Sequence, residues 1–284
     1  MRVIGAVVFW VAATVALAVA VPAAWAQRNI VDEDGYTQLA ERAAQDPALQ
    51  SAMAAELTAR ATALIAERSG GTRPVDASKV RFVAAAFTAS PAFPPLFAQV
   101  NRAAHSWMFS EPRAAGDQLV VDVAPMLKDV AIQQTLSDYN VKVPQTLKVP
   151  LTVTQGQALH QGQLHRAAVW GPWVSIGAIA LSGVCGLMTL LIARRRGRAL
   201  TSLGVSALLA GAAGWVGMEV ADRSINAVLN QTTGDIRRIA DVMVAHTEDS
   251  LHLWLNLTLI TGAALVAFGL LVAVLGGLLR RPAK

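Results

Sequence analysis

The sequence predicts a mainly α-helical fold, a four-helix transmembrane protein with a helical extracytoplasmic domain that contains a small β element. The first observation is a set of four long apolar stretches, at about residues 3–24, 167–193, 199–218 and 253–279. Each is long enough to cross a bilayer core of about 30 Å as a helix. The second is the presence of basic residues at every second end of these stretches. The third is the segment 27–166, which at about 140 residues is long enough to bury its own core.

The basic residues predict the orientation, because cytoplasmic loops of membrane proteins collect Lys and Arg. Arg2, the run at 194–198 and the tail at 280–284 together hold eight Lys and Arg and no Asp or Glu. The segment 27–166 is neutral, and the loop 219–252 holds three basic and six acidic residues. We therefore expect a plasma-membrane protein with both termini in the cytoplasm and its main domain outside. No domain concentrates positive charge, so nucleic-acid binding is not expected.

Residues 1–26 allow two interpretations. Arg2, the apolar run and the Ala24-Trp25-Ala26 sequence fit a secretory signal with a cleavage site. The apolar run is longer than the core of a usual signal, which favours an uncleaved transmembrane anchor. Either interpretation places residues 27–166 outside the cytoplasm.

Helix signals begin directly after the anchor. Acidic residues at 32–34 can cap a short helix that runs to about Ala43. Asp46 followed by Pro47 predicts an N-cap with proline in the first helical turn. The apolar stripe of this next helix recurs at helical spacing and ends before Gly70. Its members are Leu49, Met53, Leu57 and Leu64.

Two more helices are predicted in the same domain before residue 110. Asp76 or Ser78 can cap the first of them, and Ser90-Pro91 repeats the cap-plus-proline pattern for the second. Their predicted apolar stripes consist of Val80, Val83 and Phe87, and of Phe93, Phe97, Val100, Ala104, Trp107 and Met108.

The segment after these helices predicts the small β element. Residues 119–123 are rich in β-branched side chains and predict a short strand. Pro125 begins a further helix. Residues 141–143 and 147–153 are extended, and the prolines within and between them restrict these strands to edges or breaks.

Residues 167–284 predict a three-span bundle. The loop at 219–252 has the pattern of an amphipathic helix, which either caps the bundle or lies against the main outer domain. The third span is rich in small residues at four-residue spacing, which lets helices approach closely. This small face packs within the bundle or docks another membrane protein. It consists of Ala207, Ala210, Gly211 and Gly214.

No catalytic, cofactor or metal site is predicted, because no catalytic or nucleotide-binding motif occurs in a usable context. Cys185 is the only cysteine, which excludes an internal disulfide and a cysteine-based metal site. His160 and His165 are five residues apart and do not match a pair of helical zinc ligands. A possible polar surface site lies on one helix. In the alternative interpretation, its members form structural hydrogen bonds within the fold. It consists of Asn101, Arg102 and His105.

Short motifs in the first 110 residues carry a family resemblance. They are Trp25, Asp32-x-Asp34-x-Tyr36, Asp46-Pro47-Ala48-Leu49-Gln50, Ser90-Pro91-Ala92-Phe93 and Asn101-Arg102-Ala103-Ala104-His105. The chain thereby resembles a group of actinobacterial, mycobacterial-type integral membrane proteins. That resemblance implies one uncleaved N-terminal span, a helical extracytoplasmic domain and three C-terminal spans. Gly35 and Phe97 depart from the pattern. The group has no established activity, so the resemblance implies no catalytic residue.

We expect a non-catalytic cell-envelope protein, an accessory or scaffold component that binds a protein partner or lipid through its outer domain. Its expected partners are membrane lipids and either another envelope membrane protein or a second copy of the chain. One alternative is an extracytoplasmic sensor that signals through a membrane partner. The other is an envelope enzyme acting on lipid or cell wall. A flat apolar patch on the outer domain would favour a protein partner, and an apolar cleft there would favour lipid.

Overall fold

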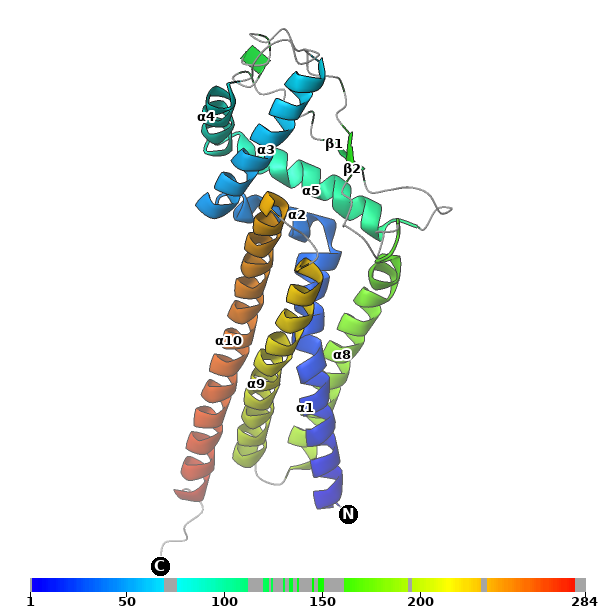
Figure 1. The fold of residues 1–284 in the computed structure, drawn as a ribbon. Coiled ribbons are helices and arrows are strands. Elements are labelled where there is room, and N and C mark those ends of the chain that lie inside the picture. Colours follow the sequence, from blue (N-terminus) through cyan, green and yellow to red (C-terminus); the bar gives the residue numbers. More distant parts are fainter. Residues whose placement is uncertain are drawn as a thin grey trace, which may run out of the picture. The chain divides into compact units, whose positions relative to one another are not determined.

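The computed structural model describes residues 2–68, 76–111, 161–193, 196–230 and 234–278, two segments at 120–122 and 148–150, and single positions between 124 and 145. Four of its helices are long and apolar enough to cross a membrane (Figure 1). One is N-terminal and three are C-terminal, with a helical region between them. The chain is therefore a multi-pass membrane protein, which confirms the prediction of four spans. The candidate spans are Ile4–Val31, His165–Ile192, Gly197–Ala227 and Gly234–Leu275.

The chain forms two compact units. The first, here called the bundle unit, contains Met1–Arg28, Val169–Arg223 and Glu248–Lys284. The second, the helical unit, contains Asn29–Ala168 and Ser224–Thr247.

The bundle unit is built from parts of four helices. Its helices are α1 (Arg2–Ala26), α8 (His165–Ile192), α9 (Arg196–Leu229) and α10 (Gly234–Leu278). Helices α1 and α9 run in the same direction, because Trp10 Nε1 donates to the Ser202 carbonyl at 2.8 Å and Thr14 Oγ1 lies 2.8 Å from Ser206 Oγ one turn later. A five-residue π-helical segment, η1 (Gln27–Val31), follows α1.

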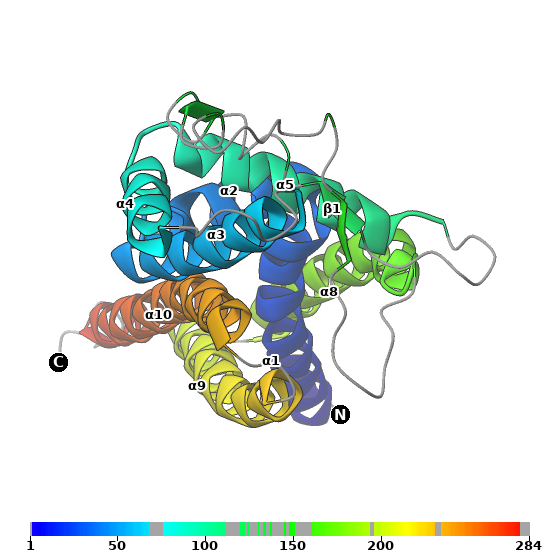
Figure 2. The same cartoon turned by 45° about the horizontal axis from the view of Figure 1, so that its top comes forward.

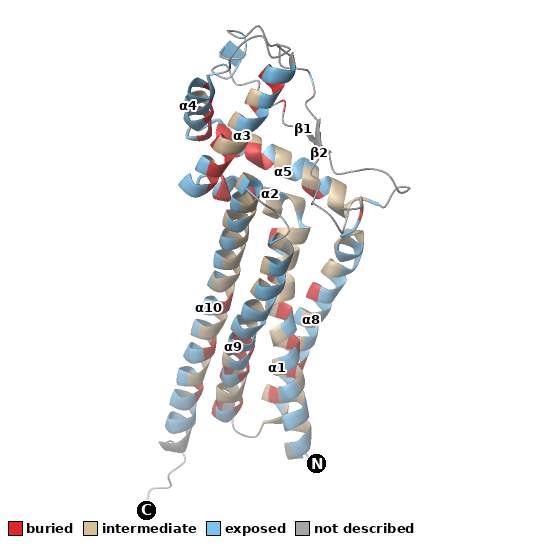
Figure 3. Cartoon of the chain, in the orientation of Figure 1, coloured by how far each residue is buried: buried red, intermediate tan, exposed pale blue. Residues whose placement is uncertain are grey.

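The helical unit contains α2 (Glu33–Ala43), α3 (Pro47–Arg68), α4 (Ala77–Thr88) and α5 (Phe93–Phe109). Helix α3 packs against α4 and α2 packs against α5 (Figure 2). Figure 3 shows the buried residues of this unit on the sides where these helices meet. The predicted stripes supply most of the core, but Ala104, Trp107 and Met108 of the last stripe are only half-buried and lie outside it. Its completely buried side chains include Leu49, Ile65 and Phe93.

Three of the four predicted helix caps are confirmed. Asp32 accepts from the Gly35 N–H, Asp46 from the Ala48 N–H at 2.7 Å, and Asp76 from the N–H groups of Ser78 and Lys79. Each carboxylate therefore satisfies backbone donors that the first helical turn leaves without partners.

The fourth predicted cap, Ser90-Pro91, is wrong. Helix α5 begins at Phe93, and Ala92 stands at its N-cap without a side-chain hydrogen bond. The second and third helical residues are Pro94 and Pro95, which have no N–H to donate. A capping side chain at position 92 would therefore have found no N–H group to accept from. With Pro94 and Pro95 in the first turn, a cap is not needed.

The described residues of the predicted helical loop at 219–252 are helical, but they belong to two longer helices. Helix α9 continues to Leu229, and α10 begins at Gly234, whose φ of 71° is readily adopted by glycine. Within the helical unit, the early part of α10 packs against the core through Ile239, Val242 and Met243. The apolar face of this segment thus packs against the helical unit, which is the second of the two predicted placements.

Two short strands, β1 (Val120–Asp122) and β2 (Lys148–Pro150), pair in antiparallel fashion with Val121 opposite Val149. The rest of the predicted small β element, and most of the helix predicted from Pro125, lies outside the described residues. That element therefore stays a prediction.

The Asp46 cap predicts a dependence of stability on acid pH. The Ala48 N–H, assisted by His246 Nε2 at 3.1 Å, lowers the pKa of the Asp46 carboxyl below its usual value. The carboxylate therefore stabilises the folded state above the unfolded pKa of about 3.9, and this stabilisation is lost as pH falls through the lowered folded pKa. Replacing Asp46 by asparagine keeps a capping oxygen but removes the charge. We expect Asp46→Asn to flatten the acid limb of stability below about pH 4.

Chemical unfolding followed by circular dichroism at several pH values measures this effect. Asp46→Ala is the matched control, because it removes the cap at every pH and costs about 1 kcal/mol throughout. An acid limb as steep in Asp46→Asn as in the unchanged chain would contradict the assignment.

Candidate functional site

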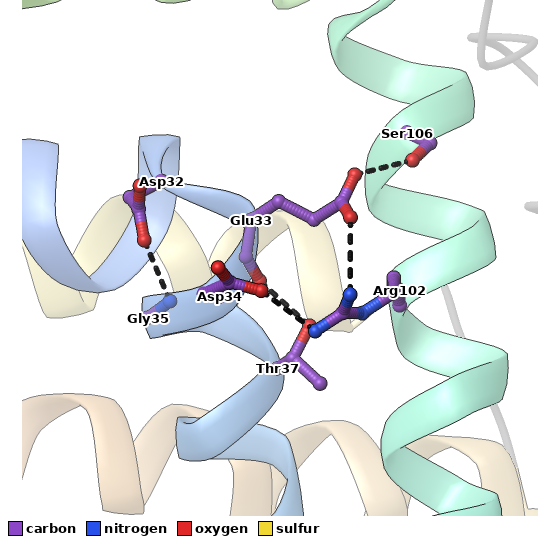
Figure 4. Close-up of polar contacts among 7 residues, drawn as sticks. All are labelled: Asp32, Glu33, Asp34, Gly35, Thr37, Arg102 and Ser106. Atoms are coloured by element: carbon purple, nitrogen blue, oxygen red, sulfur yellow. Dashed lines mark hydrogen bonds and ion pairs between the residues drawn. The ribbon is translucent and has the colours of Figure 1, made fainter.

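The polar side chains predicted as a surface site lie in a cluster between α2 and α5 of the helical unit. Arg102 on α5 pairs with two carboxylates of the first turn of α2, at 2.7 Å from Nη2 to Asp34 Oδ1 and 3.5 Å from Nη1 to Glu33 Oε1. Ser106 Oγ donates to Glu33 Oε2 at 2.6 Å (Figure 4). These groups are exposed, so each ion pair contributes at most about 1 kcal/mol. Their main effect is to fix how α2 and α5 meet.

Asn101 continues the same contact one position earlier on α5. Its Nδ2 donates to the Phe97 carbonyl at 2.9 Å, and its Oδ1 accepts a long hydrogen bond of 3.4 Å from the Tyr36 hydroxyl. Burial raises the pKa of the Tyr36 phenol, so the hydroxyl stays protonated and remains a donor. Both polar ends of Asn101 are thus engaged within the fold.

His105 is not a surface residue, because only 3% of it is exposed. Its Nε2 lies 2.9 Å from the Ile30 carbonyl of η1. The ring stacks on Phe109 at 4.2 Å between centroids and lies 5.1 Å from the Tyr36 ring. The prediction of a polar surface site is therefore wrong for His105. Two aromatic rings and a backbone carbonyl cover the imidazole, which ties α5 to the segment that follows α1.

This arrangement has the chemistry of a structural contact. The Arg102 guanidinium faces two carboxylates, and the imidazole of His105 is enclosed by aromatic rings. Sequence reasoning had missed the partners Glu33, Asp34 and Ser106, although the acidic residues in the first turn of α2 offered the complementary charge.

The predicted small face of α9 packs against α10 within the bundle unit. A methyl group added at Gly211 would lie 2.7 Å from Leu259 Cδ2, and one added at Gly214 would overlap Leu255. Ala207 and Ala210 are buried, at 6% and 3% exposure. Gly211 and Gly214 therefore approach α10 closely, and docking of another membrane protein at this face stays a prediction.

The closest approach of α9 and α10 lies one and two heptads before Gly211. A methyl group added at Gly204 would lie 2.7 Å from the Gly262 carbonyl oxygen. One added at Gly197 would lie 2.8 Å from the Gly269 carbonyl oxygen. The glycines on each helix are seven residues apart, so backbone meets backbone at successive levels. The sequence pattern named the small residues of α9, but it did not identify their partners on α10.

The described histidines have separate environments. His165 Nδ1 lies 3.3 Å from the Phe109 carbonyl, His246 contacts Asp46, and His252 stacks on Trp215 with 4.0 Å between centroids. Among the residues that the structure describes, no three His, Cys, Asp or Glu side chains group as metal ligands. His160 lies outside the described residues.

Comparison with known proteins adds no family. No family model matches the chain, and neither a curated protein nor a solved structure is significantly similar to it. The resemblance to actinobacterial membrane proteins therefore stays a prediction, while the multi-pass architecture follows from the four spans.

Proposed function

We propose that the chain is a non-catalytic scaffold or accessory protein of the cell envelope that binds a protein partner through the exposed face of α4. The observation that carries this proposal is Phe82. It is 75% exposed, whereas Phe87, Phe93 and Phe97 of the same unit are at most 5% exposed. Burying a phenylalanine side chain contributes about 1.5–3 kcal/mol, and Phe82 leaves this contribution available to a partner.

The surroundings of Phe82 support a flat contact. Ala85, Ala86 and Ala89 are also exposed and follow Phe82 at spacings that continue along one side of α4. Alanine presents no bulk, so another apolar surface can approach the helix closely. A flat apolar strip of this kind suits a protein surface better than it suits a single lipid chain.

The polar cluster supports a non-catalytic role. Asn101, Arg102 and His105 were the best candidates for chemistry in the helical unit, and hydrogen bonds or ion pairs join Asn101, Arg102 and His105 Nε2 to α2, α5 or η1. Side chains that hold helices together in this way are not free to bind and turn over a substrate.

The bundle unit supports the orientation with both termini in the cytoplasm. The start of α9 lies beside the end of α10, since Gly197 closely approaches Ala273. The start of α1 lies beside the same part of α9, through Trp10 and Ser202. The helix ends that adjoin the basic segments therefore gather at one end of the bundle, as positive-inside sorting requires. External labelling of a cysteine introduced at position 196 in intact cells would contradict this orientation.

The partner is tested by purifying the full chain from native membranes in a mild detergent. We expect a stoichiometric protein to accompany the unchanged chain and to fall about tenfold with Phe82→Ser, because the apolar anchor is lost. Gln99→Ser on α5 is the matched control, since Gln99 is also exposed but is outside the strip. A partner equally abundant with Phe82→Ser, or a chain that carries no stoichiometric protein, would refute the proposal.

A further inference from the structure

The bundle unit contains a groove-like cavity of about 600 Å³ that is partly open to its surroundings and is lined by all four helices of the unit. Leu17 and Val21 of α1, Gly186 of α8, Leu203 of α9 and Leu265 of α10 are among its walls. Ligand sites of proteins typically occupy about 300–1,000 Å³, so this volume falls within their range. Interiors are otherwise close-packed, with few voids larger than one water molecule. Because the cavity is partly open to the surroundings of the bundle, molecules of the surrounding membrane can enter it.

The cavity is elongated along the helix axes. On α10 it extends from Trp254 to Leu265, about 16 Å at a rise of 1.5 Å per residue. One leaflet of the bilayer core is about 15 Å thick. The Trp254 end is the end near the membrane surface, because Trp25 at the end of α1 donates to Ser250, one turn before Trp254. The cavity thus extends about 16 Å along the helices from the end that is near the membrane surface.

The hydroxyl groups in the cavity wall do not change its apolar character. Thr258 Oγ1 donates to the Trp254 carbonyl at 2.9 Å, and Thr261 Oγ1 donates to the Leu257 carbonyl at 2.7 Å. Ser206 Oγ likewise donates to the carbonyl four residues earlier. Each of these three hydroxyls gives its single proton to its own helix, as such side chains do in apolar surroundings. A polar ligand would lose its hydrogen bonds to water and find few donors here, so the occupant is a hydrocarbon.

The volume distinguishes a hydrocarbon chain from a helix of another protein. A helix with its side chains is about 10 Å wide, and a piece about 16 Å long would fill roughly 1,250 Å³. The cavity offers about half of that volume. A single flexible chain needs a much narrower space, and the surrounding bilayer supplies such chains at high concentration.

We propose that this cavity binds one hydrocarbon chain of a membrane lipid, taken from the leaflet whose surface lies at the Trp254 end. The lipid is held by its chain, and its head group remains at the interface. Chain length is therefore the property that determines binding. This inference concerns the bundle unit and does not depend on a protein partner at α4.

Native mass spectrometry of the full chain, purified in a mild detergent and incubated with phosphatidylglycerol, tests the proposal. We expect about one dioleoyl lipid per chain and no retention of the dihexanoyl lipid, which has the same head group but short chains. Retention of both lipids alike would show recognition of the head group and would overturn the proposal.

A pair of variants on α8 locates the lipid. A methyl group added at Gly186 would have Leu203 Cδ2 at 3.7 Å as its nearest neighbour, so Gly186→Leu can fill the cavity without a backbone clash. Gly183→Leu is the matched control, because an added methyl there meets nothing within 4 Å and Gly183 does not line the cavity. We expect lipid retention to fall about tenfold in Gly186→Leu and to persist in Gly183→Leu.

Equal retention in these two variants would overturn the proposal. If Gly186→Leu fails to fold, lipid retention is compared between Thr261→Phe and its control Ala263→Phe instead. Thr261 lines the cavity and Ala263 does not. A chain that retains no lipid, or that retains a partner helix in the lipid's place, would refute it as well.

Discussion

Replacing Phe93 by alanine is expected to destabilise the helical unit by about 3–5 kcal/mol. The side chain is completely buried, meets Phe87 edge to face at 5.8 Å and lies 5.7 Å from the Phe97 ring. Removing it leaves a cavity at the point where α4 and α5 join. Because a domain is stable by only about 5–15 kcal/mol, this loss is a large part of the total.

Chemical unfolding of the full chain, together with limited proteolysis of residues 29–168, measures the effect. Phe82→Ala is the control, since the same substitution at a side chain 75% exposed should change stability by less than about 0.5 kcal/mol. Similar losses in the two variants would mean that the core of this unit is not centred on Phe93.

Gly204→Ala is expected to destabilise the bundle unit by about 3 kcal/mol. The added methyl would lie 2.7 Å from both the Gly262 carbonyl oxygen and the Val266 nitrogen, and neither backbone atom can turn aside. Helices α9 and α10 would have to separate, and their close packing would be lost along the seam.

Thermal unfolding in detergent, followed by circular dichroism, tests this expectation. Gly217→Ala on the same helix is the matched control, because an added methyl there meets nothing within 4 Å. Alanine is a better helix former than glycine, so this variant should be as stable as the unchanged chain or more stable by up to about 1 kcal/mol. A Gly204→Ala variant that unfolds at the same temperature as the control would show that α9 and α10 are not packed at this distance.

The sequence was sufficient wherever one local segment decides the outcome. A span needs only its own apolar length, and the caps at Asp32, Asp46 and Asp76 need only the first turn of their own helices. The failed cap at Ser90 follows the same logic, because Pro94 and Pro95 were visible and their missing N–H groups could have been counted.

Features formed by two or more segments were beyond the sequence. Arg102 and Asp34 are 68 residues apart, and spacing along α5 gave the shared side of Asn101 and His105 without naming what covers it. His105 was therefore expected at the surface, although Tyr36, Phe109 and the Ile30 carbonyl enclose it. The cavity belongs to four helices at once, so no single stretch of sequence could reveal it.

The paired glycines of α9 and α10 fix the position of one helix relative to the other along the helix axes. Gly204 faces Gly262 and Gly197 faces Gly269, and both pairs repeat after seven residues. A slip of one turn, about 5.4 Å, would separate both pairs at once. Glycine would next meet glycine only after two turns, about 10.5 Å. Piston-like sliding of α10 along α9 is therefore blocked, and any signal carried through this helix pair would have to travel by rotation or tilting of the pair as a whole.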